Sequence, residues 1–474
     1  MDNLQTAGLS FSASSDSRKV ARIIIDYLYG VVFLLCAFFY ERKSSSVVSA
    51  VLILLYFIDL YRIDRVFVWK FAFVVFSSVS YLFGEFFCDL FPTYLSELGV
   101  ITHYTGAFAT LALYNWIFYT VLRLVDHRIS KRMSFKKVNY SYGGKSVSNI
   151  VFKLGGIIIF LLGLGMFMTV ARNPSFKIGL DRFAYRKEYL SQIIAKLIYY
   201  PSYLCPLIII PILQNKKKLN SKIIIRVIAV YVPFILFLIW AGHKFGSFWT
   251  LLYSIAIPLV FAYTSNKNKR ISIKSILFIV VLLLLFVVIL ILFYTLRGLS
   301  FEEAFAMLTW RVSAQGELWW KMFDLEKNAP IRLDAFFEEI RYVFKAVTSR
   351  GAVRQYGVYR LMEMFGNPSV VERAYEEGWR YSAGGFELPF YFFKYAAFII
   401  VPLIVAPIYS LLSNSYIKSV LSGDFITGIC FLHFIHVFHS AVLQGDWMEF
   451  LTLDSLFFLM VLILISLWKK YCSR

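Results

Sequence analysis

Long apolar runs separated by short polar segments fill most of the chain. A helix needs roughly 20 apolar residues to cross a bilayer core of about 30 Å, because the core holds no water to satisfy free backbone groups. Runs of this kind predict twelve transmembrane helices, of which the second is the shortest. The predicted spans are 21–40, 47–61, 66–88, 101–124, 149–171, 194–213, 223–240, 246–263, 275–296, 388–412, 421–440 and 448–468.

Composition supports a membrane protein and excludes several other classes. Hydrophobic residues make up 59% of the 474 residues and charged residues 16%, and the mean hydropathy is +0.67. These values exclude a set of soluble domains, a disordered chain, a coiled coil and a soluble nucleic-acid binder. The five cysteines are scattered and lie mostly in apolar runs, so they predict neither a disulfide framework nor a metal site. We therefore expect an all-α polytopic membrane protein.

The distribution of basic residues indicates the orientation. Lys and Arg number 49 against 29 Asp and Glu, which gives a net charge of +20. Short cytoplasmic loops of membrane proteins are enriched in Lys and Arg. The connections 125–148, 214–222 and 264–274 carry many such residues, whereas 89–100 carries none. This pattern predicts that both termini are cytosolic.

Two segments on the predicted outer side stand apart. The short loop 172–193 holds five basic residues against two acids, which is contrary to the usual orientation rule. The segment 297–387 is far longer and contains nearly equal numbers of basic and acidic residues. The sequence thus predicts spans one to nine within 1–296, an outer domain at 297–387, and spans ten to twelve within 388–474.

The outer domain contains signals for two helices. Ser300 and Glu303 form a capping box, which predicts that a helix begins at Phe301. A second helix is predicted by apolar residues at three- and four-residue steps, with charged residues on the other face. We expect this amphipathic helix to lie on the outer membrane boundary. Its apolar residues are Leu333, Phe336, Phe337, Ile340, Phe344 and Val347.

Cations on the predicted outer side are candidates for binding a diphosphate. A guanidinium group holds phosphate oxygens through two parallel hydrogen bonds and stays charged. For any single arginine, the alternative is an ion pair with a nearby acid or a lipid headgroup. The short loop has too few acids to neutralise its cations, so as a unit it favours an anionic ligand. The candidates are Arg172, Arg182 and Arg186 in that loop, Lys244 in the turn WAGHKFGS, and Arg297 and Arg311 at the start of the long segment.

Three residues are candidates for proton transfer on the same side. Glu317 lies in RVSAQGELWW and Glu387 in SAGGFELPF, and either carboxylate could accept a proton from a hydroxyl group. His243 precedes Lys244 in its turn and could move a proton near neutral pH. Capping of the adjoining helix is the alternative role for His243 and Glu387.

Aromatic and histidine side chains raise two further possibilities. Trp310, Trp319 and Trp320 could pack against sugar faces, although an aromatic belt at the membrane boundary explains them equally well. At most two of the three histidines in FLHFIHVFHS could share one coordination sphere, so we predict polar groups facing the bundle interior rather than a metal site. These are His433, His436 and His439.

The arrangement resembles the Wzy family of bacterial O-antigen and enterobacterial-common-antigen repeat-unit polymerases. The shared features are twelve spans, a basic loop between spans five and six, a large outer loop between spans nine and ten, and cytosolic termini. The local matches are AGHKFGSFWTLLYSIAIPL, TLRG, LTWRVSAQGELWW and SAGGFELPFYFFKYAAF.

This resemblance implies an inverting, metal-independent glycosyltransferase with a class C-like membrane fold and no cofactor. The growing glycan on undecaprenyl diphosphate would pass to a new lipid-linked repeat unit at the periplasmic face of the inner membrane, in lipopolysaccharide biosynthesis. The six cations would stabilise the departing diphosphate, and Glu387, Glu317 or His243 would take the acceptor proton. The implied partners are undecaprenyl-diphosphate-linked glycans, membrane lipids, a chain-length regulator and a flippase, without nucleic acid.

Two other functions remain open at this stage. An O-antigen ligase shares the long outer loop and the lipid-diphosphate donor, but such ligases are expected to carry a histidine beside an arginine there. The segment 297–387 contains no histidine. A lipid-linked oligosaccharide flippase or another transporter is expected to line its middle spans with charge, and spans five to nine are nearly free of ionisable residues.

Overall fold

The protein is an all-α membrane protein. The computed structural model describes residues 24–133, 145–178, 182–214, 221–243, 245–264, 298–381 and 385–472, with residues 288, 291, 294 and 295. Within these residues the regular secondary structure is helical apart from one short antiparallel hairpin, in which β1 (Tyr94–Leu95) pairs with β2 (Val100–Ile101). Seven of the described helical segments are long and apolar enough to cross a membrane. The number of twelve spans stays a prediction.

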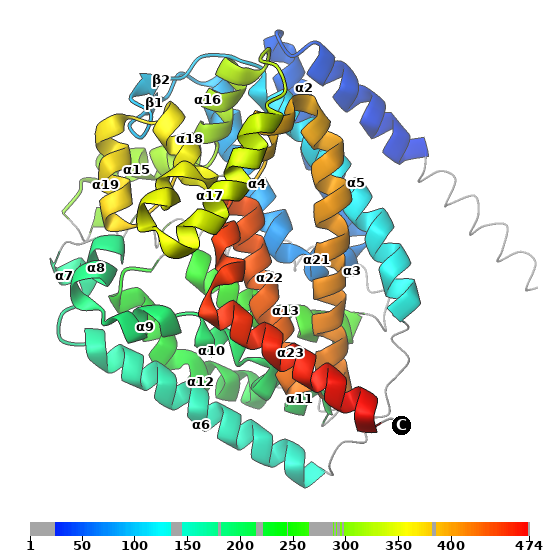
Figure 1. Cartoon of the computed structure of the whole chain (residues 1–474), viewed down its shortest axis with the longest axis vertical. Coiled ribbons are helices and arrows are strands. Elements are labelled where there is room, and N and C mark those ends of the chain that lie inside the picture. The colour runs from blue at the N-terminus through cyan, green and yellow to red at the C-terminus, as the bar shows by residue number, and fades with distance from the viewer. Residues whose placement is uncertain are drawn as a thin grey trace, which may run out of the picture.

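The helices before the outer domain follow the predicted apolar runs (Figure 1). Predicted span nine, 275–296, lies almost wholly outside the described residues. The first apolar helix is Ile24–Phe38. The labelled helices are α2 (Lys43–Ile63), α3 (Arg65–Lys70), α4 (Ala72–Leu90), α5 (Ala107–Met133), α6 (Lys145–Val170), α7 (Ser175–Ile178), α8 (Arg182–Tyr189), α9 (Gln192–Leu197), α10 (Tyr200–Tyr203), α11 (Pro206–Gln214), α12 (Ser221–Trp240) and α13 (Phe245–Thr264).

Two of the predicted spans before the outer domain are interrupted. Span 66–88 is divided at Phe71 between α3 and α4, and span 194–213 is divided among α9, α10 and α11. Pro201 lies in the first turn of α10, and Pro206 is the first residue of α11. Proline has no backbone N–H to donate to the preceding turn, which explains why a continuous helix does not run through this stretch.

The outer domain is a group of short helices. The capping box predicted from Ser300 and Glu303 is present, with both reciprocal hydrogen bonds formed, and α15 begins at Phe301 as expected. In Figure 1 the domain gathers at one end of the molecule, beside the hairpin and above α7 and α8. Its elements are α15 (Phe301–Ser313), α16 (Glu317–Glu326), α17 (Leu333–Thr348), η1 (Arg350–Gln355), α18 (Gly357–Phe365) and α19 (Pro368–Glu377).

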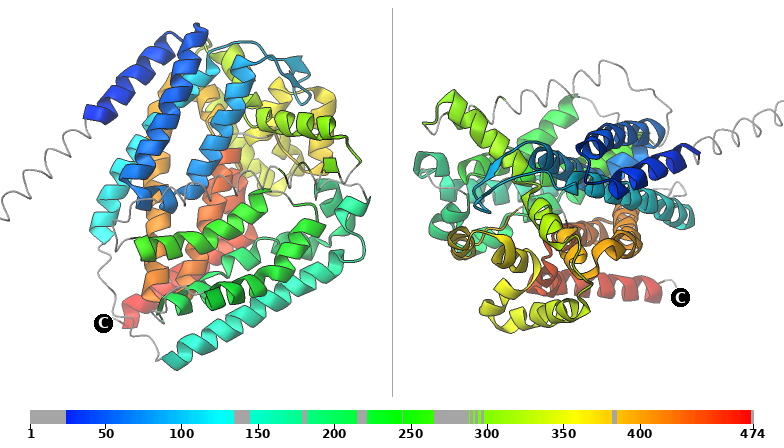
Figure 2. Two further views of the ribbon diagram at one scale, coloured as in Figure 1. Left: turned by 180° about the vertical axis from the view of Figure 1, so that it is seen from behind. Right: turned by 90° about the horizontal axis from the view of Figure 1, so that it is seen from above.

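The C-terminal part returns to the membrane bundle. Predicted span ten begins with the short helices α20 (Glu387–Phe393) and η2 (Lys394–Ala396) before α21 (Ala397–Ser422). It continues with α22 (Phe425–Gln444), η3 (Trp447–Leu451) and α23 (Leu453–Cys472). Helix α21 packs between α5 and α22, while α6 packs on α12. Figure 2 shows α6, α12 and α13 crossing obliquely to α5 and α21.

The predicted amphipathic helix is confirmed as α17. Its inward face carries Ala335, Glu339, Val343 and Ala346, which are buried. The apolar stripe faces outward instead: all of its members except Phe336 are between 41% and 65% exposed. An apolar face left open on a membrane protein suits contact with lipid. Its position on the membrane boundary stays a prediction.

Close contact between two glycines holds the outer domain on the bundle. A Cβ on Gly316 would lie 2.3 Å from the Glu85 backbone nitrogen, and one on Gly84 would lie 2.5 Å from the Val312 oxygen. Helix α4 and the junction between α15 and α16 therefore meet backbone to backbone. The Cys88 thiol also donates to the Ser313 oxygen at 3.2 Å across this contact.

A buried polar network ties three membrane helices together. The Lys70 ammonium group of α3 lies 2.8 Å from Asp126 of α5 and donates to Asn414 of α21 at 2.9 Å. Asp126 also accepts hydrogen bonds from Asn414 and from Ser410. Because every charge in this network has partners, we interpret it as structural.

Candidate functional site

The structure places three of the six predicted cations. Arg172, Arg186 and Arg311 are exposed, and among the described residues none of them forms an ion pair with an acid. Within the described part of the chain, Arg186 donates to the Ala195 backbone oxygen, at 3.3 Å. Arg182 belongs to α8, but its side chain falls outside the described part of the structure, as do Lys244 and Arg297 altogether.

Most later arginines of the outer domain behave differently. Five of them each form an ion pair with an acid of the domain or of the loop beside it, so the ion-pair alternative applies to these five. The pairs are Arg332 with Glu326 at 3.0 Å, Arg354 with Glu372 at 2.7 Å, Arg360 with Glu338 at 3.1 Å, Arg373 with Glu377 at 3.0 Å and Arg380 with Asp446 at 2.6 Å. Arg341 is exposed and forms no ion pair among the described residues.

The short basic loop lies against the outer domain. Helix α8 contacts α19, and Lys187 donates from its ammonium group to the Glu376 backbone oxygen at 3.1 Å. The Tyr185 hydroxyl donates to the Asn173 oxygen at 2.6 Å, which fixes α8 to the start of the loop. The two outer segments singled out in the sequence therefore share one surface.

The two predicted acids lie in the interior. Glu317 and Glu387 are both 0% exposed. Burial raises the pKa of the Glu317 carboxyl well above its usual value, and Glu97 raises it further, whereas Arg311 lowers it. Glu387 accepts a hydrogen bond at 3.0 Å from the backbone N–H of Phe386, the residue before it. Neither carboxyl group is exposed to a substrate hydroxyl in this structure, which argues against these two of the three predicted candidates for the base.

His243 lies in the predicted turn and is half-buried. Its Nδ1 atom lies 2.9 Å from the Ser247 hydroxyl oxygen, at the start of α13. This contact joins the turn to the first turn of α13.

The predicted sugar-stacking tryptophans also require correction. Trp319 and Trp320 are 0% and 1% exposed, and their indole N–H groups donate to the Ala107 and His103 oxygens at 3.0 and 2.9 Å. They anchor α16 to the bundle and present no free ring face. Trp310 is partly buried, and the Arg311 guanidinium carbon lies 4.5 Å from its ring centroid.

A polar cluster not predicted from the sequence lies where the loop after α22 meets the outer domain. We call it the 446 cluster, and it consists of Arg380, Asp446 and Glu449 with Tyr356 and Tyr359. Arg380 donates to Asp446 at 2.6 Å, and its guanidinium carbon lies 5.1 Å from the Tyr359 ring centroid. The Tyr356 hydroxyl donates to Asp446 at 3.4 Å. The cluster combines two carboxylates and one fixed cation.

The pKa of Glu449, the second acid of the 446 cluster, lies near neutral pH. Glu449 is partly buried, in contrast to Glu317 and Glu387, which are fully buried. This partial burial raises the pKa of Glu449 to about 7, and the charge of Asp446 contributes to the increase. A hydrogen bond from Ser440 and the charge of Arg380 oppose it. A carboxyl group that is half ionised near neutral pH can both accept and release protons, as general acid–base catalysis requires.

The sequence carries a weak signal for the 446 cluster. The segment Gly445–Asp446–Trp447–Met448–Glu449 separates two apolar runs and places two acids three residues apart. We predicted that span twelve begins at residue 448, which put Glu449 inside the membrane. In the structure α23 begins at Leu453, and η3 precedes it.

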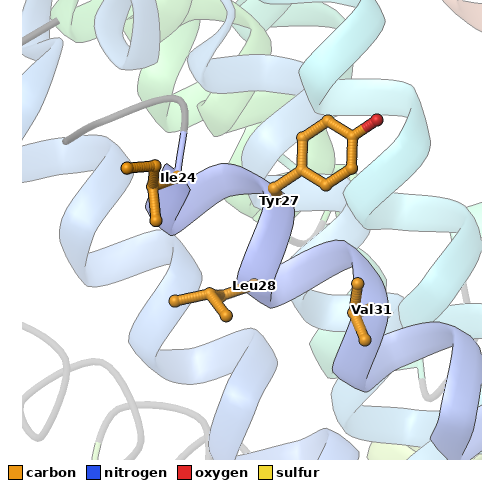
Figure 3. Close-up of a pocket in the computed structure, with 4 residues that line it drawn as sticks. All are labelled: Ile24, Tyr27, Leu28 and Val31. Atoms are coloured by element: carbon orange, nitrogen blue, oxygen red, sulfur yellow. The ribbon is translucent and has the colours of Figure 1, made fainter. Parts of the chain in front are cut away.

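Two other features offer no catalytic site. The His433 Nε2 atom lies 3.1 Å from the Ser455 hydroxyl, and the His439 Nδ1 atom lies 3.2 Å from the Tyr409 hydroxyl. In the described part of the chain, no group of three or more His, Cys, Asp or Glu residues could hold a metal ion. A shallow depression on the Ile24–Phe38 helix has only the Tyr27 hydroxyl as a polar side-chain group (Figure 3). Its four lining residues are Ile24, Tyr27, Leu28 and Val31.

In a comparison with known proteins, the 446 cluster lies within a segment that matches a sequence-family model. Residues 352–459 match a sequence-family model described as a family of unknown function, DUF6418. This segment runs from η1 through α22 and η3 into α23, and includes all five residues of the cluster. No curated protein and no solved structure matches the chain.

Proposed function

We propose that the protein polymerises undecaprenyl-diphosphate-linked oligosaccharide repeat units by inverting glycosyl transfer. The growing chain passes from its lipid carrier to the terminal sugar of a new repeat unit. The observation that carries this proposal is the surface shared by the short basic loop and the outer domain. There Arg172 and Arg186 are exposed and without acid partners among the described residues, whereas five of the domain's later arginines are paired with acids.

The charge arrangement supports departure of a diphosphate. When the bond between the anomeric carbon and phosphate oxygen breaks, the bonding electrons go to the phosphate and its negative charge increases. Fixed cations already in place stabilise that charge without reorganisation of solvent. Arg172, Arg186 and Arg311 would supply this stabilisation, together with Arg182, Lys244 and Arg297.

The remaining features of the proposal concern cell location and fold. The active side faces the periplasm, both termini lie in the cytosol, and the protein resides in the bacterial inner membrane. Its helical architecture is that of a class C-like glycosyltransferase. A chain-length regulator and a flippase act beside it.

Deletion of the gene tests the proposal directly. Cell-envelope polysaccharide is separated on a gel, and the deletion strain is expected to lose the ladder of long chains while it keeps a band with one repeat. Complementation with the wild-type gene restores the ladder. An unchanged ladder in the deletion strain would contradict the proposal.

Conservative substitution of the outer arginines tests the diphosphate role. Arg186→Lys and Arg311→Lys keep the charge but lose the two-pronged hydrogen bonding, so each is expected to lower the initial polymerisation rate by about tenfold or more. The rate is measured with lipid-linked repeat units extracted from the deletion strain.

The matched control for these variants is Arg373→Lys. Arg373 is 67% exposed in its side chain and pairs with Glu377 within α19, so this change is expected to leave the rate unaltered. Equal rates for all three variants would contradict bidentate binding of the diphosphate.

A ligase is the second candidate because of one specific contact. His103, from the loop before α5, lies against the outer domain: its Nε2 atom is 3.3 Å from Asp324, and its backbone oxygen accepts from Trp320. A histidine therefore adjoins the outer domain although residues 297–387 contain none. The gel distinguishes the two functions, since loss of a ligase removes even the band with one repeat.

A further inference from the structure

We propose that the loop 445–449 binds the acceptor sugar, with Trp447 as its stacking surface and Glu449 as the base that removes the proton from the attacking hydroxyl. This inference rests on the proposed function and assigns the acceptor side of the same reaction. Trp447 takes the stacking role first predicted for Trp319 and Trp320, and Glu449 takes the role of base first predicted for Glu317 or Glu387. Those four residues are buried.

The backbone of this loop is held firmly. Gly445 has φ +63°, a left-handed conformation that favours glycine, and a Cβ there would lie 3.0 Å from the Cα of Gly357. At the end of α22, just before the loop, the Val442 oxygen would lie 2.1 Å from a Cβ on Gly385. The loop is therefore fitted between α18 and the segment that leads to α20, which fixes the direction of the side chains that follow.

Asp446 is held in place by two donors. Arg380 donates to one carboxylate oxygen at 2.6 Å, and Tyr356 donates to the other at 3.4 Å. The Asp446 side chain is 10% exposed and that of Arg380 is 24% exposed, so the pair is largely shielded from water. Asp446 is therefore a positioning residue that sets the charge next to Glu449.

Trp447, which lies between the two acids in the sequence, provides an exposed aromatic surface. It is 38% exposed, and its ring stacks towards Phe450 with centroids 6.4 Å apart and planes inclined by 18°. Flat aromatic rings pack well against the C–H faces of sugars. An exposed tryptophan between two carboxylates offers stacking and hydroxyl recognition within five residues of chain.

Glu449 has a defined set of charged and titratable neighbours. Asp446 lies on its own loop, and Arg380 reaches it from the outer domain. Tyr203 of α10 lies close enough to interact with it, and Asp454 of α23 interacts with the same tyrosine. Glu339 of α17 interacts with Tyr356 of the 446 cluster. Of the two charged groups that act on Glu449 itself, Asp446 favours the protonated carboxyl and Arg380 favours the carboxylate.

The transfer step balances with Glu449 as proton acceptor. The acceptor hydroxyl oxygen forms a bond to the anomeric carbon while the bond from that carbon to the diphosphate oxygen breaks. The diphosphate leaves with the bonding electron pair, and the hydroxyl proton moves to the Glu449 carboxylate. The protonated carboxyl then releases the proton to water and is ready for another transfer.

Removal of the carboxylate tests this assignment. Glu449→Gln is expected to lower kcat for polymerisation by roughly 100-fold or more, the usual effect of losing a general base. Lipid-linked repeat units extracted from the deletion strain serve as substrate. The matched control is Glu338→Gln, because Glu338 is 60% exposed and pairs with Arg360 away from the 446 cluster. Unchanged kcat and pH dependence in Glu449→Gln would overturn the assignment.

The pH dependence separates a catalytic role from a structural one. In the wild type, kcat/KM is expected to rise with pH and to level off above about 7, because the ionised form of Glu449 is the base. Asp446→Asn removes a negative charge that raises the pKa of Glu449, so the midpoint is expected to move to lower pH. A midpoint that stays in place, or moves upward, argues against Glu449 as the titrating base.

The stacking role is tested at Trp447. Trp447→Ala is expected to raise the KM for acceptor with a smaller change in kcat, and Trp447→Phe is expected to recover most of the affinity. If Trp447 only anchors the protein at the membrane boundary, neither change alters KM, and that result would remove the sugar-binding role. Failure of the polymerase proposal itself has a different signature, since the wild type would then form no polymer from the extracted substrate.

Discussion

Lys70→Met is expected to destabilise the folded protein by about 3 to 5 kcal/mol, the usual cost of leaving one member of a buried ion pair without its partner. The Lys70 side chain is 3% exposed, and its ammonium group holds Asp126, Ser130 and Asn414 from two other membrane helices. Its loss leaves the Asp126 charge in a water-poor interior with only neutral donors. Thermal unfolding of the purified protein in detergent measures the effect.

A second variant distinguishes charge from packing. Removing both charges in Lys70→Met with Asp126→Leu is expected to recover part of the lost stability, because no uncompensated charge remains. Lys469→Met is the surface control: Lys469 is 59% exposed and pairs with Asp424, so its loss is expected to cost about 1 kcal/mol or less. A double variant no more stable than Lys70→Met would contradict this explanation.

Gly316→Ala is expected to loosen the outer domain from the membrane bundle. The new Cβ would lie 2.3 Å from the Glu85 nitrogen and 2.5 Å from its Cα, and backbone atoms cannot move aside as a flexible side chain can. Such overpacking typically costs about 1 to 3 kcal/mol, and we expect the upper end of that range here. Thermal unfolding and protease cleavage within 298–381 report the change.

The control for this prediction is Gly165→Ala in α6. A Cβ at Gly165 meets no atom within 4 Å, so alanine is expected to leave stability unchanged or to raise it by about 0.5 to 1 kcal/mol. Equal thermal stability and equal protease cleavage of the two variants would show that the contact between Gly84 and Gly316 does not hold the outer domain on the bundle.

Features set by local sequence were predictable. The capping box fixes the start of α15, and the spacing of apolar residues predicts α17, because both depend on residues within one or two helical turns. The proline breaks in 194–213 also have a visible cause, although we predicted an uninterrupted span there. Local chemistry decides such features before the chain folds.

The candidate site was less predictable because it depends on distant contacts. Arg380 and Asp446 are 66 positions apart, and nothing near either residue indicates that they pair. Trp319 and Trp320 lie beside polar residues, as boundary aromatics do, yet packing on α5 and the preceding loop buries them. Glu449 adjoins an apolar run that is long enough to span the membrane. The sequence therefore predicted Glu449 within that span, whereas in the structure it belongs to η3, before α23.

The hydrogen bond from Lys187 to the Glu376 backbone oxygen has a consequence for comparing related sequences. A main-chain oxygen is present whatever residue occupies position 376, so substitution there leaves an acceptor for the lysine. The two positions therefore have no reason to change together during evolution, and a search for correlated substitutions would overlook this attachment of the basic loop. Only coordinates, or a change at position 187 itself, would reveal it.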